Sequence, residues 1–143
     1  MSTIPIIQNE YATLVYHPEE RIVHHTFYKP IGGHEFRNVL NTGIETLEKS
    51  RASKWLSDDR GNSALSREDT EWSKNDWFPR AVRAGWKYWA LVGPHDIMAR
   101  MNLKEFVDAY FEQGLVIKVF NKPEDAMKWL LSCDTLAKEL EQG

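Results

Sequence analysis

Short β-rich runs alternate with longer stretches of helical periodicity along most of this chain, and that alternation restricts the fold more than any other feature of the sequence. Five runs are typical of strands, and they lie at 11–16, 21–29, 54–59, 86–93 and 115–120. The first two are separated by "HPEE", which favours a turn and predicts an antiparallel hairpin. A helical stretch follows the second strand and each later one, so the order β-β-α-β-α-β-α-β-α predicts an α/β fold. We expect a mixed, mostly parallel sheet of four to five strands with covering helices.

The first helical stretch follows "KPIGG" and has its apolar residues on one face, namely Phe36, Val39, Leu40, Ile44 and Leu47. Gly43 lies inside this helix, where glycine costs up to about 1 kcal/mol relative to alanine. Close approach of a neighbouring element would explain that glycine. The two glycines of "IGGHEF" could also bind an anion at the helix entrance, although the lysine and spacing of a phosphate loop are missing.

The later helices carry clear start and stop signals. Ser66 and Asp69 have the spacing of a helix cap, and Pro79 predicts two helical pieces that meet near residues 76–78. The stretch 94–114 is predicted as one helix that ends at Gly114, and a last helix is expected to begin around Asn121 and Pro123.

Length, charge and cysteine content exclude several classes of protein. The chain has 143 residues, which fits a single domain at 1–143 with its core at about 11–132. A net charge of -3 and the lack of a basic stripe argue against nucleic-acid binding. Cys133 is the only cysteine, no signal peptide is recognisable, and no apolar run is long enough for a transmembrane segment. We therefore expect a cytoplasmic protein.

A site is expected beyond the carboxyl ends of the parallel strands, where loops and helix starts converge. The rule selects the segments 58–63, 94–96 and 121–122. The first is the richest in functional groups, and its residues are Asp58, Asp59, Arg60, Gly61, Asn62 and Ser63. Carboxylates could act as acid and base or bind a cation, arginine could hold an anion, and glycine permits close backbone approach. A solvated loop is the simpler alternative.

The histidines do not predict a metal site. His24 and His25 are adjacent on a strand and therefore face opposite ways, which predicts one histidine in the core and one covered or exposed. His17, His34 and His95 have no recognised ligand spacing, so neither a metal nor another cofactor is expected. His95 follows a parallel strand, where it could cap the next helix or bind an anion. Cys133 has no basic neighbour and is interpreted as an inert thiol.

Aromatic residues are concentrated in one stretch of 18 residues, where they are Trp72, Trp77, Phe78, Trp86 and Trp89. Such a group fills a core layer or lines an apolar pocket. Core packing is the simpler interpretation, whereas a pocket would indicate a ligand-binding site.

The order of elements over about 11–132, together with "DDRG" at 58–61, resembles the STAS and SpoIIAA-like family, in particular its uncharacterised bacterial branch. Antagonist members of that family have Asp-Ser-Ser-Gly at this place, and the first serine is phosphorylated. Asp58 and Gly61 match the pattern, whereas Asp59 stands at the acceptor position and Arg60 at the next serine. The resemblance implies a non-catalytic module that docks a partner through the second helix and the preceding loop, without the phosphorylation.

Three functions remain open from the sequence. The first is a regulatory, protein-binding module that uses Asp58–Ser63, Trp72, His95 and Asn121. The second is a carrier of a small apolar ligand, in which the aromatic residues and His95 form a closed cavity of roughly 300 Å³ or more near the strand ends. The third is an enzyme that uses Asp58 or Asp59 with His95. A homodimer through an edge strand such as 11–16, or through a helix, is compatible with each.

Overall fold

The computed structural model describes residues 3–62 and 65–142, with the side chains of Asp96, Ala99 and 134–142 left out. It contains six strands, which are β1 (Ile4–Gln8), β2 (Ala12–His17), β3 (Ile22–Phe27), β4 (Lys54–Asp58), β5 (Tyr88–Val92) and β6 (Val116–Phe120). The helical elements are α1 (Gly33–Ser50), α2 (Arg67–Trp72), the π-helix η1 (Ser73–Trp77), α3 (Phe78–Arg83), α4 (His95–Arg100), α5 (Leu103–Glu112) and α6 (Pro123–Gln142).

The strands form a single mixed sheet in which spatial order follows chain order, β1-β2-β3-β4-β5-β6. The β1–β2 and β2–β3 pairs are antiparallel, whereas the β3–β4, β4–β5 and β5–β6 pairs are parallel. Each connection between parallel strands leads to the adjacent strand, always toward the β6 edge of the sheet. Right-handed crossovers of this kind place their helices on one face of the sheet.

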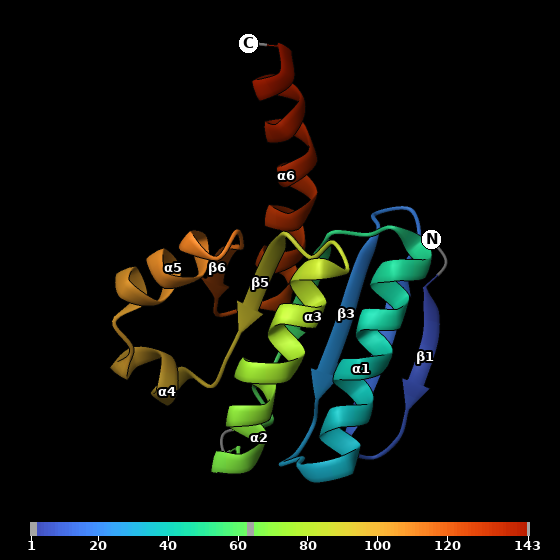
Figure 1. Cartoon of the computed structure of the whole chain (residues 1–143), viewed down its shortest axis with the longest axis vertical. Helices are drawn as coiled ribbons and strands as arrows, with labels where there is room; N and C mark the ends of the chain where they lie inside the picture. The colour runs from blue at the N-terminus through green and yellow to red at the C-terminus, as the bar shows by residue number, and fades with distance from the viewer. Residues whose placement is uncertain (1–2, 63–64, 143) are drawn as a thin grey trace.

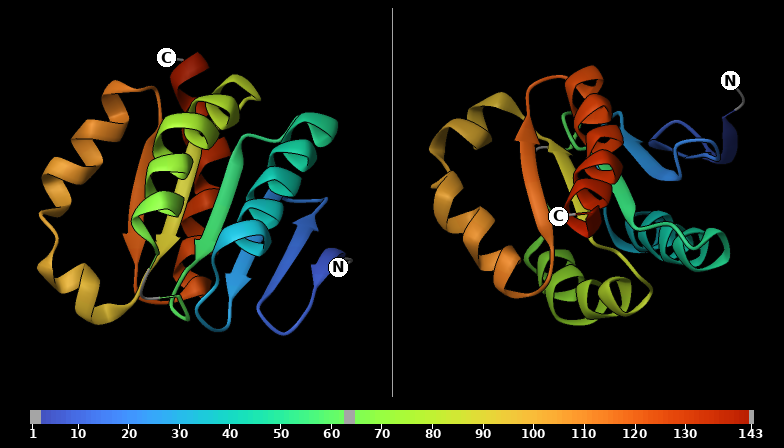
Figure 2. Two further views of the ribbon diagram at one scale, coloured as in Figure 1. Left: turned by 60° about the horizontal axis from the view of Figure 1, so that its bottom comes forward. Right: turned by 90° about the horizontal axis from the view of Figure 1, so that it is seen from above.

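Helices cover both faces of the sheet unequally (Figures 1 and 2). The helices α1 and α3 lie side by side on one face, whereas α6 packs on the opposite face against β4, β5 and β6. The pair α4 and α5 lies beside the β6 edge. None of the helices in the described part of the chain is long and apolar enough to cross a membrane.

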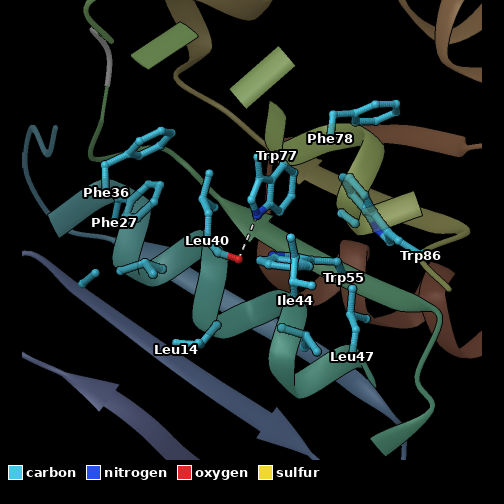
Figure 3. Packing of buried hydrophobic residues seen from close by; sticks show 14 of the residues in the cluster. Leu14, Phe27, Phe36, Leu40, Ile44, Leu47, Trp55, Trp77, Phe78 and Trp86 are labelled. Carbon is cyan, nitrogen blue, oxygen red and sulfur yellow. Dashed lines mark hydrogen bonds between the residues drawn. The ribbon is translucent and has the colours of Figure 1, made fainter. Parts of the chain in front are cut away.

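The larger core lies between the sheet and α1 to α3 (Figure 3). All five apolar residues predicted for the buried face of α1 are buried there. The indole nitrogen of Trp77 donates a hydrogen bond of 2.8 Å to the carbonyl of Leu40, which ties α1 to η1. A smaller core beneath α6 contains Ile22, Leu56, Ala90, Val92, Ala126 and Leu130.

The structure confirms the α/β class and the mixed sheet but corrects three details. Its sixth strand, β1, was not predicted, because Pro5 and a register shift between Pro5 and Ile7 interrupt an exposed segment. The run predicted at 11–16 therefore lies inside the sheet, and β1 is the edge strand. The predicted helix at 94–114 is divided into α4 and α5 by Asn102, whose side chain accepts a hydrogen bond from the backbone amide of Glu105.

The helical pieces expected around Pro79 are present. Pro79 lies at the start of α3, and Ser66 caps α2 by accepting a hydrogen bond of 3.1 Å from the Asp69 amide. Between α2 and α3 the chain forms η1 rather than a break. Single π turns are rare, and they are often found at functional sites.

Gly43 allows α1 to lie directly against the indole of Trp55, which is the close neighbour expected at this glycine. A Cβ atom at position 43 would lie 2.0 Å from the nearest ring carbon of Trp55. Trp55 is fully buried, with Trp77 and Trp86 packed against it at ring centroid distances of 5.4 and 5.8 Å, so the indole has little room to move.

Replacing Gly43 with alanine is therefore expected to destabilise the protein by about 1–3 kcal/mol. At an ordinary position inside a helix, the same replacement would stabilise the protein by up to about 1 kcal/mol. Chemical denaturation of Gly43→Ala measures the loss. In a Trp55→Leu background the same substitution should be neutral or stabilising. Equal destabilisation in both backgrounds would contradict the close-packing explanation.

Candidate functional site

The carboxyl ends of β3, β4, β5 and β6 lie along one edge of the sheet, because these four strands are parallel. A partly open cavity of about 250 Å³ lies beside this edge, on the face covered by α1 to α3. It is smaller and more open than the closed cavity of roughly 300 Å³ or more that the carrier hypothesis predicts. Its residues come from β3, β4, β5, α1, α2, η1, α3, α5 and the loop after β4. The position agrees with the general rule for ligand sites in open α/β sheets.

Aromatic side chains are the largest group in the described cavity wall, and they are Phe27, Phe36, Trp77, Phe78, Trp86, Trp89 and Tyr110. They pack edge to face and tilted against one another at centroid distances such as 5.3 Å for Trp77–Trp86 and 5.2 Å for Phe78–Tyr110. Burial raises the pKa of the Tyr110 phenol, which is consistent with a weakly hydrated wall. The rings thus serve both as core and as lining.

A chain of hydrogen bonds joins the core to this cavity. The buried indole nitrogen of Trp55 donates to Nδ1 of His25 at 2.9 Å, and Nε2 of His25 lies 2.6 Å from Oδ1 of Asp59. His25 and Asp59 line the cavity, whereas Trp55 lies beneath it. His25 is 3% exposed, so its orientation is fixed by these two bonds and by packing against Phe27.

The Trp55 bond determines which nitrogen of His25 carries a proton. An indole N–H only donates, so Nδ1 of His25 must offer its lone pair, and the proton of a neutral ring lies on Nε2. Nε2 then donates to Asp59. An imidazolium would turn two N–H groups toward each other at the Trp55 contact. The His25–Asp59 contact is therefore a hydrogen bond from a neutral ring to a carboxylate, rather than an ion pair.

Further polar groups lie in the same cavity wall. Ser57 is adjacent to His25 in the parallel ladder, and its hydroxyl accepts a hydrogen bond of 2.9 Å from the indole nitrogen of Trp89. That hydroxyl still has its own proton to donate. Asn62 also lines the cavity, and its Oδ1 accepts from the Ile31 amide at 3.3 Å. These contacts leave polar groups exposed to a ligand within a largely apolar cavity.

Side chains of the loop 58–63, which the sequence marks as richest in functional groups, point to the two opposite faces of the sheet. Asp59 and Asn62 reach the cavity, whereas Asp58 is buried on the α6 side and forms a bidentate contact with Arg60, with both N···O distances 2.8 Å. This contact raises the pKa of the Arg60 guanidinium. Asp58 and Asp59 therefore form no paired site.

Gly61 allows a close approach to the chain itself, because a Cβ there would lie 2.2 Å from the Phe27 carbonyl oxygen. Ser63 lies outside the described residues.

Three other predicted site residues lie away from the cavity lining. Trp72 packs edge to face against Phe36, with the Arg37 guanidinium 5.0 Å from its ring centroid. His95 is exposed at the start of α4, whose entrance has no side-chain cap. Asn121 is exposed before α6. Asp59 bonds to His25 rather than to His95, so the geometry does not bring the predicted enzyme pair together.

The entrance at "IGGHEF", where the sequence leaves anion binding open, is occupied by a carboxylate of the chain itself. Oδ2 of the buried Asp69 accepts a hydrogen bond of 2.9 Å from the Gly33 amide, at the first residue of α1. Oδ1 of the same carboxylate lies 3.6 Å from Nε of Arg37. Asp69 therefore stabilises the start of α1 and fixes α2 beside it.

Sequence reasoning missed His25 and Ser57 as cavity residues. Alternation along the strand predicts one histidine in the core and one covered or exposed, without saying which, and the structure confirms this with His25 buried and His24 partly covered. Recognising His25 beside Ser57 also requires the register between β3 and β4, which the sequence does not contain. Their closeness to the strand ends is the signal that could have suggested them.

His17 and His24 form a pair of contacting histidines on the opposite face of the sheet from His25. Nε2 of His17 is 3.1 Å from Nδ1 of His24, and the rings stack at 5.3 Å. Burial, and then the neighbouring His17, lower the pKa of His24 to about 4, and burial also lowers that of His17. Within the described part of the chain, no group of three or more metal-ligating side chains is found.

Comparison of the chain with protein-family models, with curated proteins and with solved structures gave no match.

The His24 pKa predicts acid sensitivity with a defined window. His24 binds a proton near pH 6.5 in the unfolded chain but only near pH 4 in the folded protein. The free energy of unfolding should therefore fall as the pH drops from 6.5 to 4. The loss is expected to reach roughly 2–3 kcal/mol. Denaturation as a function of pH measures it, with His24→Gln as the comparison. An unchanged pH profile in His24→Gln would contradict this assignment.

Proposed function

We propose that the protein binds a small, largely apolar ligand in the cavity beside the carboxyl ends of β3 to β5. The observation that carries the proposal is a cavity of about 250 Å³ that combines aromatic walls with a few polar groups at fixed positions. This combination is typical of small-molecule sites. A dry cavity of about 150 Å³ accommodates benzene, so a bicyclic body is a reasonable size for a first ligand.

Binding is better supported than catalysis by the arrangement of His25. Both ring nitrogens are engaged, one by Trp55 and the other by Asp59. A general base needs a free nitrogen within reach of its substrate. We therefore propose a non-catalytic protein, and we propose the cytoplasm as its location.

Docking of a protein through residues 58–63, which the resemblance to STAS and SpoIIAA-like domains implies, is supported less well. Several polar groups of this loop are engaged within the chain, since Asp58 binds Arg60, Asp59 binds His25 and Asn62 accepts from the Ile31 amide. A docking surface would instead present them to a partner. A regulatory role through ligand binding remains compatible with the resemblance.

A cavity-filling substitution tests the proposed function. Ser73 lines the cavity from η1, whereas Asn75, in the same π-helix, is exposed and is not among the lining residues. Ser73→Phe should weaken binding of 2-naphthylmethanol by about tenfold or more, equivalent to 1.4 kcal/mol or more. Titration calorimetry gives the dissociation constants, and Asn75→Phe is the matched control.

Thermal unfolding of both variants must first establish that they fold. Binding that a folded Ser73→Phe retains in full would contradict the assignment of the cavity. Failure of the native protein to bind any naphthyl probe at millimolar concentration would contradict the proposed function itself.

A further inference from the structure

The wall of the cavity carries a carboxylate, Asp59, that forms no ion pair with a lysine or arginine among the residues that the structure describes. A neutral His25 leaves the Asp59 carboxylate with its full charge, because the Trp55 contact occupies the Nδ1 lone pair. The nearest cation in sequence, Arg60, is engaged by Asp58 on the other face of the sheet. An unpaired charge beside apolar walls favours a ligand that compensates it.

One oxygen of Asp59 remains available for such a ligand. Oδ1 accepts from His25, whereas Oδ2 has no hydrogen-bond partner among the residues that the structure describes. The side chain is 30% exposed and belongs to the cavity wall. Ser57 lies opposite His25 on the neighbouring strand and adds a second polar group. Its hydroxyl accepts from Trp89, so its own proton can still be donated to a ligand.

The aromatic walls favour the same charge. Faces of tryptophan, tyrosine and phenylalanine rings are electronegative and attract ammonium groups, and aromatic cages use this to hold organic cations. Three tryptophans, Trp77, Trp86 and Trp89, line this cavity, together with Phe78 and Tyr110. A carboxylate within an aromatic wall thus combines direct charge pairing with cation–π attraction.

We propose that the cavity binds organic cations, in which an ammonium group meets Asp59 and an apolar body lies against the tryptophans. The inference rests on the proposed function and names the ligand class. Lys74 is the cationic residue among the described lining residues, and it is exposed. Its charge repels a cation, so we expect the ammonium group to lie at Asp59 and away from Lys74.

Three probes with one naphthyl body separate charge from shape. They are 2-naphthylmethylamine, which is an ammonium at pH 7, 2-naphthylmethanol, which is neutral, and 2-naphthylacetate, which is an anion. Titration calorimetry of the native protein should give the tightest binding for the ammonium, by about tenfold or more over the alcohol. The anion should bind most weakly.

Substitution of the carboxylate tests the role of Asp59. Asp59→Asn keeps the shape and removes the charge, so it should weaken ammonium binding by about tenfold or more and alcohol binding by less than about threefold. Glu71→Gln removes the same charge from an exposed position in α2 that does not line the cavity, and it should leave both affinities unchanged.

Lys74→Gln provides an independent test if Asp59→Asn loosens the His25 contact. Removing this positive charge should strengthen ammonium binding severalfold and leave alcohol binding unchanged. Equal affinity for ammonium and alcohol, with no loss in Asp59→Asn, would overturn the inference while the proposed function stands. Weaker ammonium binding in Lys74→Gln would also overturn it. Absence of binding by all three probes would instead overturn the proposed function.

Discussion

The hydrogen bonds from Trp55 to His25 and from His25 to Asp59 connect the hydrophobic core with the cavity. Trp55 is itself held by the close approach of α1 at Gly43 and by the rings of Trp77 and Trp86. The orientation of a fully buried indole thus determines the tautomer of His25, and that tautomer determines the charge presented by Asp59. A core residue in this way defines the chemistry of a cavity that it does not itself line.

Much of the fold could be predicted because its signals are local. Helical spacing identified the buried face of α1, and cap and proline patterns located α2 and α3. The edge strand β1 was missed because Pro5, an irregular register and exposed side chains weaken the strand pattern. The division between α4 and α5 was missed because the apolar spacing continues through Asn102, where a side-chain cap starts a new helix.

The site was only partly predictable, since it depends on contacts between strands. The strand-end rule selected Asp59 and Asn62, which reach the cavity, but also Asp58, His95 and Asn121, which do not line it. His25 and Ser57 lie within strands and become neighbours only through the register of β3 and β4. The different surroundings of Asp58 and Asp59 show that sequence adjacency does not imply a shared site at a strand end.

Nitrogen-15 NMR of the His25 side chain tests the central claim most directly, because the two ring nitrogens give distinct signals when only one is protonated. The expected result is a ring with its proton on Nε2 and a bare Nδ1 that receives the Trp55 N–H. A proton on Nδ1, in either the other tautomer or an imidazolium, would contradict the account. It would also remove the net charge, or the bond to Asp59, on which the ligand class depends.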